Sequence, residues 1–257
     1  MPARLASTRL PRKPLYPLLG KPLIEWVWRR VLTMTVLDHA VVATDSPEVA
    51  EVCRSLGAPV ELTSSDHLSG TDRVAEVAER PRYVGYDVVA NVQGDEPLLD
   101  ELHVRSAVDL VRNQGWQVGT CATPVREARE YQDPSVVKVV RASSGRALYF
   151  SRAKIPHITE KLCKEQDLSP EGSLRHIGIY TYERLALQAW ASLAPSPLEQ
   201  IESLEQLRPL EAGLQIGVAI VEAAEPGVDT PADAVRMEQQ LSRLDHPTPV
   251  GPYDRKY

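Results

Sequence analysis

Residues 88–97 read Val88-Val89-Ala90-Asn91-Val92-Gln93-Gly94-Asp95-Glu96-Pro97, and this stretch decides the fold. Its first half is apolar and β-branched, as in a buried strand, and its second half is a polar turn at the strand's carboxyl end. Because ligands of open α/β sheets bind just beyond the carboxyl ends of strands, we expect Asp95 to face a ligand. Gly94 permits a tight turn and Pro97 ends the strand. Asp95 is suited to Mg²⁺, which takes carboxylate and phosphate oxygens. On this stretch alone, a solvated acidic turn is equally compatible.

Composition narrows the class of protein. The 257 residues are 43% apolar and 25% charged, as in ordinary globular proteins. The formal net charge is −6 and no lysine or arginine run stands out, so neither nucleic acid nor a membrane is an expected partner. Cys53, Cys121 and Cys163 form no C-x-x-C pair, which argues against zinc and disulfides and fits a cytoplasmic protein. No apolar run approaches the roughly 18 residues that span a bilayer. No signal peptide is expected, since the first motif begins at residue 2.

Strand and helix patterns alternate along the chain, which predicts βαβ units and a doubly wound, mostly parallel, Rossmann-like α/β sheet. A small antiparallel hairpin is predicted from 136–141 and 146–150. Residues 157–174 are expected to form an irregular loop, and the proline-rich residues 246–257 a loose tail. The expected strands are 39–44, 59–63, 88–92, 118–123, 176–182 and 216–221. The expected helices are 22–32, 46–56, 99–113, 185–193 and 198–212, with two more starting near 69 and 231.

The amino-terminal residues 2–15 predict a loop rich in cations. Arg4, Arg9 and Lys13 supply three positive charges, and Ser7 adds a hydroxyl between them. Such a loop can wrap a polyphosphate with forked and point charges. It is not a P-loop, because the chain has no G-x-x-x-x-G-K-[ST]. On composition alone, a solvated basic tail is the simpler alternative.

A set of motifs in a fixed order extends over nearly the whole chain, and together they resemble the 3-deoxy-manno-octulosonate cytidylyltransferase (CMP-Kdo synthetase) family. They are Pro-Ala-Arg-x-x-Ser-Thr-Arg-Leu-Pro (2–11), Lys-Pro-Leu (13–15), Ala-Thr-Asp (43–45), Ser-Gly-Thr-Asp-Arg (69–73), Asn-Val-Gln-Gly-Asp-Glu-Pro (91–97), Val-Lys-Val-Val (137–140), Ala-Leu-Tyr-Phe-Ser-Arg (147–152), Ile-Pro (155–156), Arg-His-Ile-Gly-Ile-Tyr (175–180), Ser-Pro-Leu-Glu (196–199), Leu-Glu-Gln-Leu-Arg (204–208) and Gly-Val-Asp-Thr-Pro (227–231).

The resemblance implies a nucleotidyltransferase that moves CMP from CTP to the anomeric hydroxyl of 3-deoxy-manno-octulosonate (Kdo), releases pyrophosphate and needs Mg²⁺, in lipopolysaccharide biosynthesis. It implies one domain over 1–257, a dimerisation and sugar-binding subdomain at 136–182, and a homodimer. The implied catalytic residues are Lys13, Asp95 and Asp229, of which the two aspartates are metal ligands. The implied CTP-binding residues are Arg4, Ser7, Arg9, Lys13, Gly70, Thr71 and Arg73. The implied sugar-acid pocket contains Gln93, Arg152, His176, Tyr180 and Glu205.

Simpler roles exist for several of these side chains. On its alternating strand, His176 is otherwise a half-buried structural histidine; Glu205 is otherwise a solvated helix residue. Asp229 can serve as a helix cap, and Arg152 can pair with any surface acid.

Two departures from the family pattern leave alternative functions open beside the leading hypothesis of an active cytidylyltransferase. The family has an apolar strand before Pro-Ala-Arg, whereas here Met1 takes its place, so the first strand is expected to be missing. Arg12 stands where the family has glycine, and arginine there requires a positive φ or approaches the triphosphate too closely. The alternatives are a weakly active or non-catalytic nucleotide- or sugar-binding paralogue, and a cytidylyltransferase for a related sugar acid.

Overall fold

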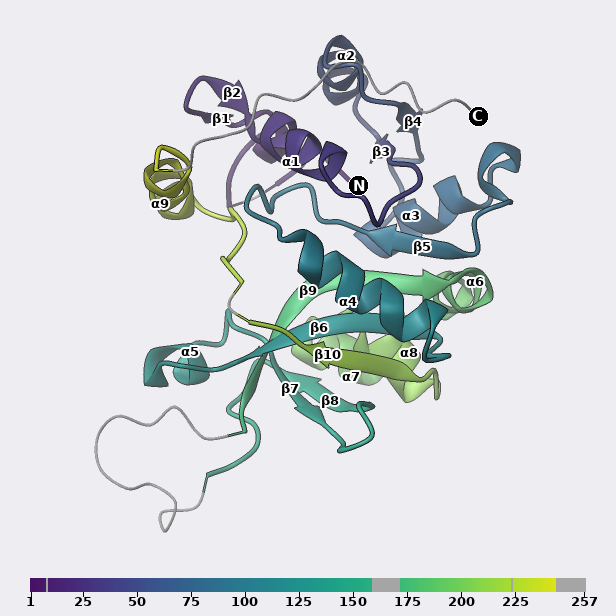
Figure 1. Cartoon of the computed structure of the whole chain (residues 1–257), viewed down its shortest axis with the longest axis vertical. Coiled ribbons are helices and arrows are strands. Elements are labelled where there is room, and N and C mark those ends of the chain that lie inside the picture. The colour runs from purple at the N-terminus through teal and green to yellow at the C-terminus, as the bar shows by residue number, and fades with distance from the viewer. Residues whose placement is uncertain (8, 159–171, 223, 244–257) are drawn as a thin grey trace. The chain divides into compact units, whose positions relative to one another are not determined.

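The computed structural model describes residues 1–7, 9–158, 172–222 and 224–243 (Figure 1). They form two compact units. Unit 1 contains residues 1–84, 91–101 and the chain from 225 onward, and unit 2 contains residues 85–90 and 102–224. The predicted loop at 157–174 falls largely outside the described residues, and the predicted tail at 246–257 falls wholly outside them.

Unit 1 is built around a short parallel sheet. Strand β3 (Val42–Thr44) pairs in parallel with β4 (Val60–Leu62). On the other side of β3, the Ala3 N–H donates to the Ala43 carbonyl at 2.8 Å, and the Ala43 N–H donates to the Met1 carbonyl at 2.9 Å. Residues 1–3 therefore pair with the sheet in the place where the sequence predicts a lost strand. A small antiparallel hairpin, β1 (Pro17–Leu18) and β2 (Lys21–Pro22), follows the basic loop.

The helices of unit 1 begin where their sequences predict. They are α1 (Leu23–Leu32), α2 (Pro47–Ser55), α3 (Gly70–Ala78) and α9 (Pro231–Leu241), with 3-10 turns η1 (Lys13–Leu15) and η2 (Pro81–Tyr83). Ser46, Ser69 and Thr230 cap α2, α3 and α9 by accepting a backbone N–H with the side-chain oxygen. Residues from both ends of the chain share one buried cluster: Leu10, Leu18, Leu23, Trp26, Val228, Ala234, Met237 and Leu241.

Unit 2 contains a six-stranded sheet with strand order β10-β6-β9-β7-β8, and β5 pairs with β9 outside this path. The strands are β5 (Val88–Asn91), β6 (Val118–Pro124), β7 (Lys138–Arg141), β8 (Ala147–Ser151), β9 (Leu174–Glu183) and β10 (Ile216–Ile220). β10 and β6 are parallel, whereas β6–β9, β9–β7 and β7–β8 are antiparallel. The helices are α4 (Glu101–Arg112), α5 (Ala128–Gln132), α6 (Arg184–Ser192), α7 (Pro197–Glu202) and α8 (Leu207–Glu211).

Helix α4 packs directly on β6. A Cβ at Gly119 would lie 2.3 Å from the Ala107 carbonyl oxygen, so only glycine allows this close approach. The Thr181 hydroxyl of β9 donates to the same carbonyl at 2.6 Å. These contacts fix α4 against the sheet.

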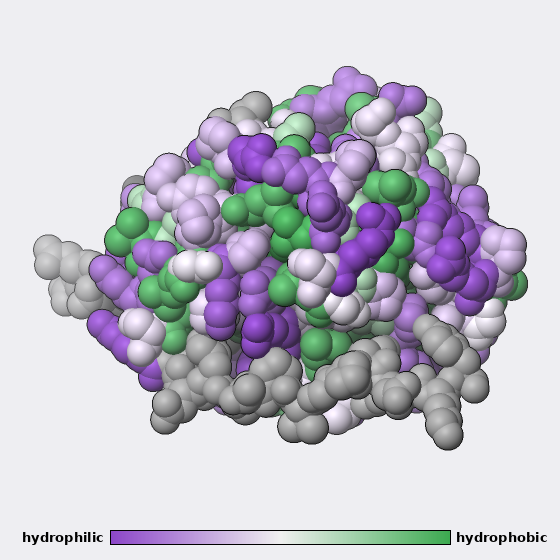
Figure 2. Space-filling model, turned by 90° about the horizontal axis from the view of Figure 1, so that it is seen from above, coloured by the Kyte–Doolittle hydropathy of each residue, from purple (hydrophilic) through white to green (hydrophobic). Residues whose placement is uncertain are grey.

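The predicted α/β fold class with a small antiparallel hairpin is confirmed. The hairpin β7–β8 continues the larger sheet through β9. The predicted single helix over 198–212 was wrong: it is two helices, α7 and α8, because Ser203 takes a left-handed conformation (φ 52°) and ends α7. Helix α5 was not predicted. No helix in the described part of the chain is long and apolar enough to cross a bilayer. On the face drawn in Figure 2, hydrophilic side chains are interspersed with smaller apolar areas.

Candidate active site

The basic loop and two distant acidic turns of unit 1 meet at the side chain of Lys13. Its ammonium contacts Asp95 Oδ2 and lies 2.7 Å from Asp229 Oδ1. The side chain of Lys13 is 15% exposed, against 28% for Asp95 and 45% for Asp229. The structure therefore brings together the three residues that the family resemblance implies are catalytic.

Local backbone geometry places Lys13. Arg12 precedes η1 with φ 57° and ψ 35°, in the left-handed region that the sequence predicts for an arginine at a glycine position. The Arg12 side chain turns to Glu48 near the start of α2 and forms an ion pair there. The Leu15 N–H donates to the Arg12 carbonyl at 2.8 Å, and Pro14, directly after Lys13, is buried. Arg12 is thus accommodated by the fold, and its charge is directed away from Lys13.

Two glycines allow the acidic turns to come close. A Cβ at Gly94 would lie 2.9 Å from the Pro2 carbonyl oxygen, so the turn before Asp95 needs glycine for space. A Cβ at Gly227 would lie 3.2 Å from the Asp95 carbonyl oxygen. The turn containing Asp229 can therefore lie directly against the turn containing Asp95.

The start of α9 holds Asp229 in place. Thr230 and Asp233 form a reciprocal capping box at this helix end. The Asp229 N–H also donates to Asp233 Oδ2 at 3.2 Å. Asp229 precedes the capping residue and keeps its own carboxylate for Lys13 and for Arg9, whose Nη2 is 3.1 Å away. The simpler prediction that Asp229 merely caps the helix was wrong, because Thr230 does so.

The charges of this cluster stabilise one another. Burial lowers the pKa of Lys13, but the neighbouring Asp95 and Asp229 carboxylates outweigh it, so the net pKa is raised above the ordinary value of 10.5. Lys13 is therefore a permanent cation at neutral pH, suited to holding a phosphate oxygen as a point charge.

The two carboxylates fit a hard divalent cation whose remaining coordination positions are filled by substrate oxygens. Among the described residues, no group of three or more His, Cys, Asp or Glu side chains could hold a metal. Asp95 and Asp229 nevertheless each direct one carboxylate oxygen at the same ammonium group, that of Lys13. Mg²⁺ is usually bound in this way, through one or two carboxylates plus phosphates and water.

The other predicted CTP-binding residues of the basic loop are spread along it. Arg4 and Arg9 are exposed, and Arg9 reaches the cluster through Asp229. Ser7 Oγ accepts the Leu10 N–H at 3.4 Å, so its hydroxyl also shapes the loop. Thr8 belongs to the residues that the structure leaves undescribed.

The first turn of α3 lies beside Pro2 in the amino-terminal segment that pairs with β3. A Cβ at Gly70 would lie 3.2 Å from Pro2 Cγ, and Thr71 is fully buried. Ser69 caps the helix in a capping box with Asp72. This places Gly70 next to the residues that lead into the basic loop.

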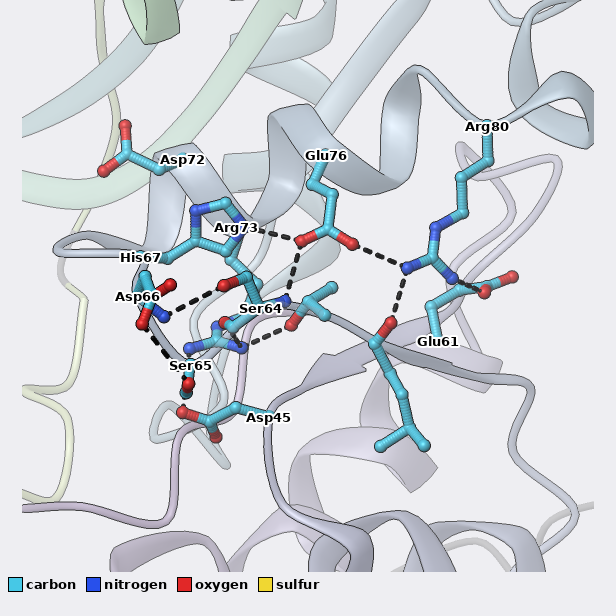
Figure 3. A network of polar contacts seen from close by, with 12 residues as sticks. Asp45, Glu61, Ser64, Ser65, Asp66, His67, Asp72, Arg73, Glu76 and Arg80 are labelled. Atoms are coloured by element: carbon cyan, nitrogen blue, oxygen red, sulfur yellow. Dashed lines mark hydrogen bonds and ion pairs between the residues drawn. The ribbon is translucent and has the colours of Figure 1, made fainter.

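Arg73 is buried at the centre of a polar network (Figure 3). Its guanidinium contacts Thr63 Oγ1, the Ser64 carbonyl at 3.3 Å and Asp45 Oδ2 at 3.1 Å. With 3% of its side chain exposed, it ties the end of β3 to the turn after β4. The structure therefore gives Arg73 a role in holding together the turns that follow β3 and β4.

A second group of predicted residues meets in unit 2. His176 on β9 lies edge-on to Phe150 with ring centres 5.0 Å apart, and its ring is 5.4 Å from that of Tyr180. Tyr180 is buried, and its hydroxyl has no hydrogen-bond partner among the described residues. Burial, followed by the charges of Glu205 and Tyr182, raises the pKa of Tyr180 well above 10. Three of the predicted sugar-acid residues, His176, Tyr180 and Glu205, are thus neighbours.

The hydrogen bond to Thr120 determines which ring nitrogen of His176 carries the proton. The Thr120 hydroxyl donates to the Ile179 carbonyl at 2.7 Å, so it can only accept from His176 Nε2, which lies 2.9 Å away. The proton of the neutral ring is therefore on Nε2, and Nδ1 is the acceptor. Burial lowers the pKa of His176 to about 3, which keeps the ring neutral at pH 7. No sequence signal pointed to Thr120; the β-bulge after it, which sets these contacts, was not predicted.

Arg152, also in unit 2, bonds to backbone carbonyls. Its Nε donates to the Glu202 carbonyl at 2.9 Å, and its Nη atoms donate to Pro134 and Ser203 carbonyls at 3.1 and 3.3 Å. The structure therefore connects Arg152 to the turn between α7 and α8 that leads to Glu205. Gln93, the fifth predicted residue, belongs to unit 1 and lies between β5 and Asp95.

Comparison with known proteins identifies the family. A cytidylyltransferase family model matches residues 1–216. The chain is 51% identical over 238 residues to a 3-deoxy-manno-octulosonate cytidylyltransferase of Gemmatimonas aurantiaca, covering 92% of this chain and 90% of that protein. The chain belongs to the 3-deoxy-manno-octulosonate cytidylyltransferase family. A second family member, from Syntrophotalea carbinolica, is 45% identical over 247 residues, with 95% and 98% of the two chains covered.

Two solved structures agree with the fold. A CMP:2-keto-3-deoxy-manno-octonic acid synthetase solved in complex with CTP is 38% identical, with a TM-score of 0.85 and 94% and 96% of the two chains covered. A cytidylyltransferase from Leptospira borgpetersenii, at 17% identity and a TM-score of 0.60, shares the fold. The predicted family and enzyme class are confirmed.

Proposed function

We propose that this chain transfers CMP from CTP to the anomeric hydroxyl of Kdo, giving CMP-Kdo and pyrophosphate. The family membership supports the reaction, since relatives at 45–51% identity carry that name and a structural neighbour at 38% identity binds CTP. The observation that carries the proposal is the convergence of Lys13, Asp95 and Asp229 from three distant parts of the chain.

The residues of unit 1 suit the nucleotide half of the reaction. Lys13 and Arg9 supply positive charge for the triphosphate, and Arg4 extends that charge along the basic loop. Phosphoryl transfer depends mostly on positioning and charge neutralisation, which fixed cations provide. Asp95 and Asp229 would hold Mg²⁺, which when bound neutralises phosphate charge and lowers the pKa of an attacking hydroxyl.

The cluster in unit 2 suits a polyhydroxylated acid. His176 Nδ1 accepts a hydrogen bond, the Tyr180 hydroxyl donates one, and the Glu205 carboxylate accepts further hydroxyl protons. We propose these three side chains for sugar hydroxyls. Gln93 of unit 1 is proposed as a sugar-acid ligand from the family resemblance alone. Arg152 is assigned to the same pocket because a guanidinium can bind a carboxylate through two parallel bonds, although its present contacts are with backbone carbonyls.

The non-catalytic alternative loses its main argument. Arg12 does not displace Lys13, because the backbone adopts the left-handed conformation and the side chain pairs with Glu48. The homodimer, the cytoplasmic location and the role in lipopolysaccharide synthesis are proposed from the family resemblance.

Pyrophosphate release from CTP, Kdo and Mg²⁺ tests the function. The unaltered chain should turn over, and Asp229→Asn should reduce kcat at least about 100-fold, since metal charge stabilisation contributes several kcal/mol. Asp87→Asn, which alters an exposed aspartate of unit 2, should leave kcat unchanged. Near-normal turnover by Asp229→Asn at saturating Mg²⁺ would exclude this residue as a ligand. Turnover with a sialic or 8-amino sugar acid but not with Kdo would reassign the substrate.

A further inference from the structure

The ammonium group of Lys13 occupies the place toward which the carboxylates of Asp95 and Asp229 both point. Lys13 Nζ contacts Asp95 Oδ2 and lies 2.7 Å from Asp229 Oδ1. Those are the oxygens that a divalent cation would use. An ammonium and a divalent cation cannot both bind the same two oxygens at contact distance, because their like charges would repel strongly at this separation. Lys13 and the metal are therefore competitors for one position.

The surroundings favour a side chain that can leave without moving the loop. Around Lys13 the backbone is fixed by the Leu15 N–H bond to Arg12, by buried Pro14 and by the Arg12–Glu48 ion pair. The lysine side chain itself is a flexible stem of four carbons. Its ammonium can therefore swing from the carboxylates to a phosphate while its Cα stays in place.

We propose that Lys13 is a place-holding counter-ion, which keeps Asp95 and Asp229 paired and closed to divalent cations until the triphosphate of the nucleotide draws its ammonium away. This inference rests on the proposed function, since it assumes that a triphosphate enters this site. It makes Lys13 a positioning residue for the metal as well as a phosphate ligand. Nucleotide then binds before the carboxylate-bound cation, and divalent cations alone bind weakly.

The test measures Mn²⁺ binding to the full chain without nucleotide, by the loss of the free Mn²⁺ electron paramagnetic resonance signal. The unaltered chain should bind Mn²⁺ weakly. Lys13→Met, which removes the ammonium and keeps the side-chain length, should bind at least tenfold more tightly. Lys154→Met, which removes an exposed lysine of unit 2, should bind as the unaltered chain does. The double variant Lys13→Met/Asp95→Asn should lose the gain, which assigns the new affinity to this pair of carboxylates.

A second variant protects the test against misfolding. Lys13→Gln removes the charge but keeps an amide that can donate to the carboxylates, and it should also bind Mn²⁺ more tightly. For either variant, Mn²⁺ should raise the melting temperature more than it does for the unaltered chain, because a ligand that binds only the folded state stabilises it.

The outcomes separate this inference from the proposed reaction. Equal Mn²⁺ affinity of Lys13→Met, Lys13→Gln and the unaltered chain would overturn the place-holding role and leave the proposed CMP transfer standing. A gain that survives Asp95→Asn would also overturn it. Failure of the unaltered chain to release pyrophosphate from CTP and Kdo would overturn the proposed function, whatever the Mn²⁺ result.

Discussion

The backbone N–H of Val228 donates to the carbonyl oxygen of Asp95 at 2.9 Å. This bond joins two turns more than a hundred residues apart in sequence, and each turn carries one of the carboxylates that face Lys13. Spacing between the two aspartates is therefore set by backbone, which is stiffer than a pair of side chains.

Gly227→Ala should disturb this spacing. The added Cβ would lie 3.2 Å from the Asp95 carbonyl oxygen and 3.4 Å from Glu96 Cγ, so one turn must shift by a few tenths of an ångström. We expect kcat to fall more than tenfold while the free energy of unfolding falls by about 1–3 kcal/mol. Gly85→Ala is the matched control, because its Cβ would meet nothing within 4 Å. Equal activity of the two variants would show that the turn tolerates the shift.

Arg12 allows the cost of a left-handed arginine to be measured. Both Arg12→Gly and Arg12→Ala remove the ion pair with Glu48, but only glycine adopts φ 57° without steric cost. The glycine variant should therefore be more stable than the alanine variant by about 1 kcal/mol in urea unfolding. Glu48→Gln, which removes only the exposed ion pair, should change stability by less than about 1 kcal/mol. If the alanine variant is as stable as the glycine variant, the conformation carries no strain.

We expect even the conservative replacement of Arg73 by lysine to lower the stability of the fold. Its planar guanidinium contacts Thr63, Ser64 and Asp45 together, whereas one ammonium cannot span all three. Arg73→Ala, which leaves the half-buried Asp45 carboxylate without this partner, should lower the free energy of unfolding by about 3–5 kcal/mol. Arg73→Lys should fall between that variant and the unaltered chain. Arg126→Lys, on an exposed arginine of unit 2, is the control and should unfold normally.

Acid should destabilise the chain through His176. Burial lowers its folded pKa to about 3, below the unfolded value of about 6.5. Between these values the unfolded chain binds more protons, so stability falls as the pH falls, by at most about 1.4 kcal/mol per pH unit for this residue. Urea unfolding at several pH values should show a smaller slope for His176→Gln than for the unaltered chain. His157→Gln, at an exposed histidine, should keep the full slope.

The two acidic turns lie where local sequence signals predict them. Asp95 follows a β-branched run, and Asp229 precedes a Thr-Pro helix start, so both turns could be placed from their neighbours. Their meeting at Lys13 came from the family resemblance, because nothing in the spacing of residues 13, 95 and 229 shows that they are close.

The parts that were missed depend on contacts made after folding. The break between α7 and α8 comes from Ser203 in a left-handed conformation. Serine rarely adopts this conformation, so its presence in the sequence does not predict the break. Thr120 acquires its role through a β-bulge opposite Ile177–Tyr180, a shift of register that alternation alone does not predict. The backbone-carbonyl contacts of Arg152 and Arg73 within their own units also have no local sequence signal, and the ligand-binding roles of both side chains stay predictions.

The buried cluster that joins Leu10, Leu18, Leu23 and Trp26 to Val228 and helix α9 has a consequence for biosynthesis. A ribosome delivers the amino-terminal side of this cluster first and its carboxyl-terminal side only after all of unit 2 has been made. Until then, the nascent chain leaves these apolar residues uncovered, the circumstance in which chaperones are needed. Asp229 is synthesised just before helix α9. A chain that terminates before this point therefore lacks both the helix that covers the cluster and one of the two carboxylates that face Lys13.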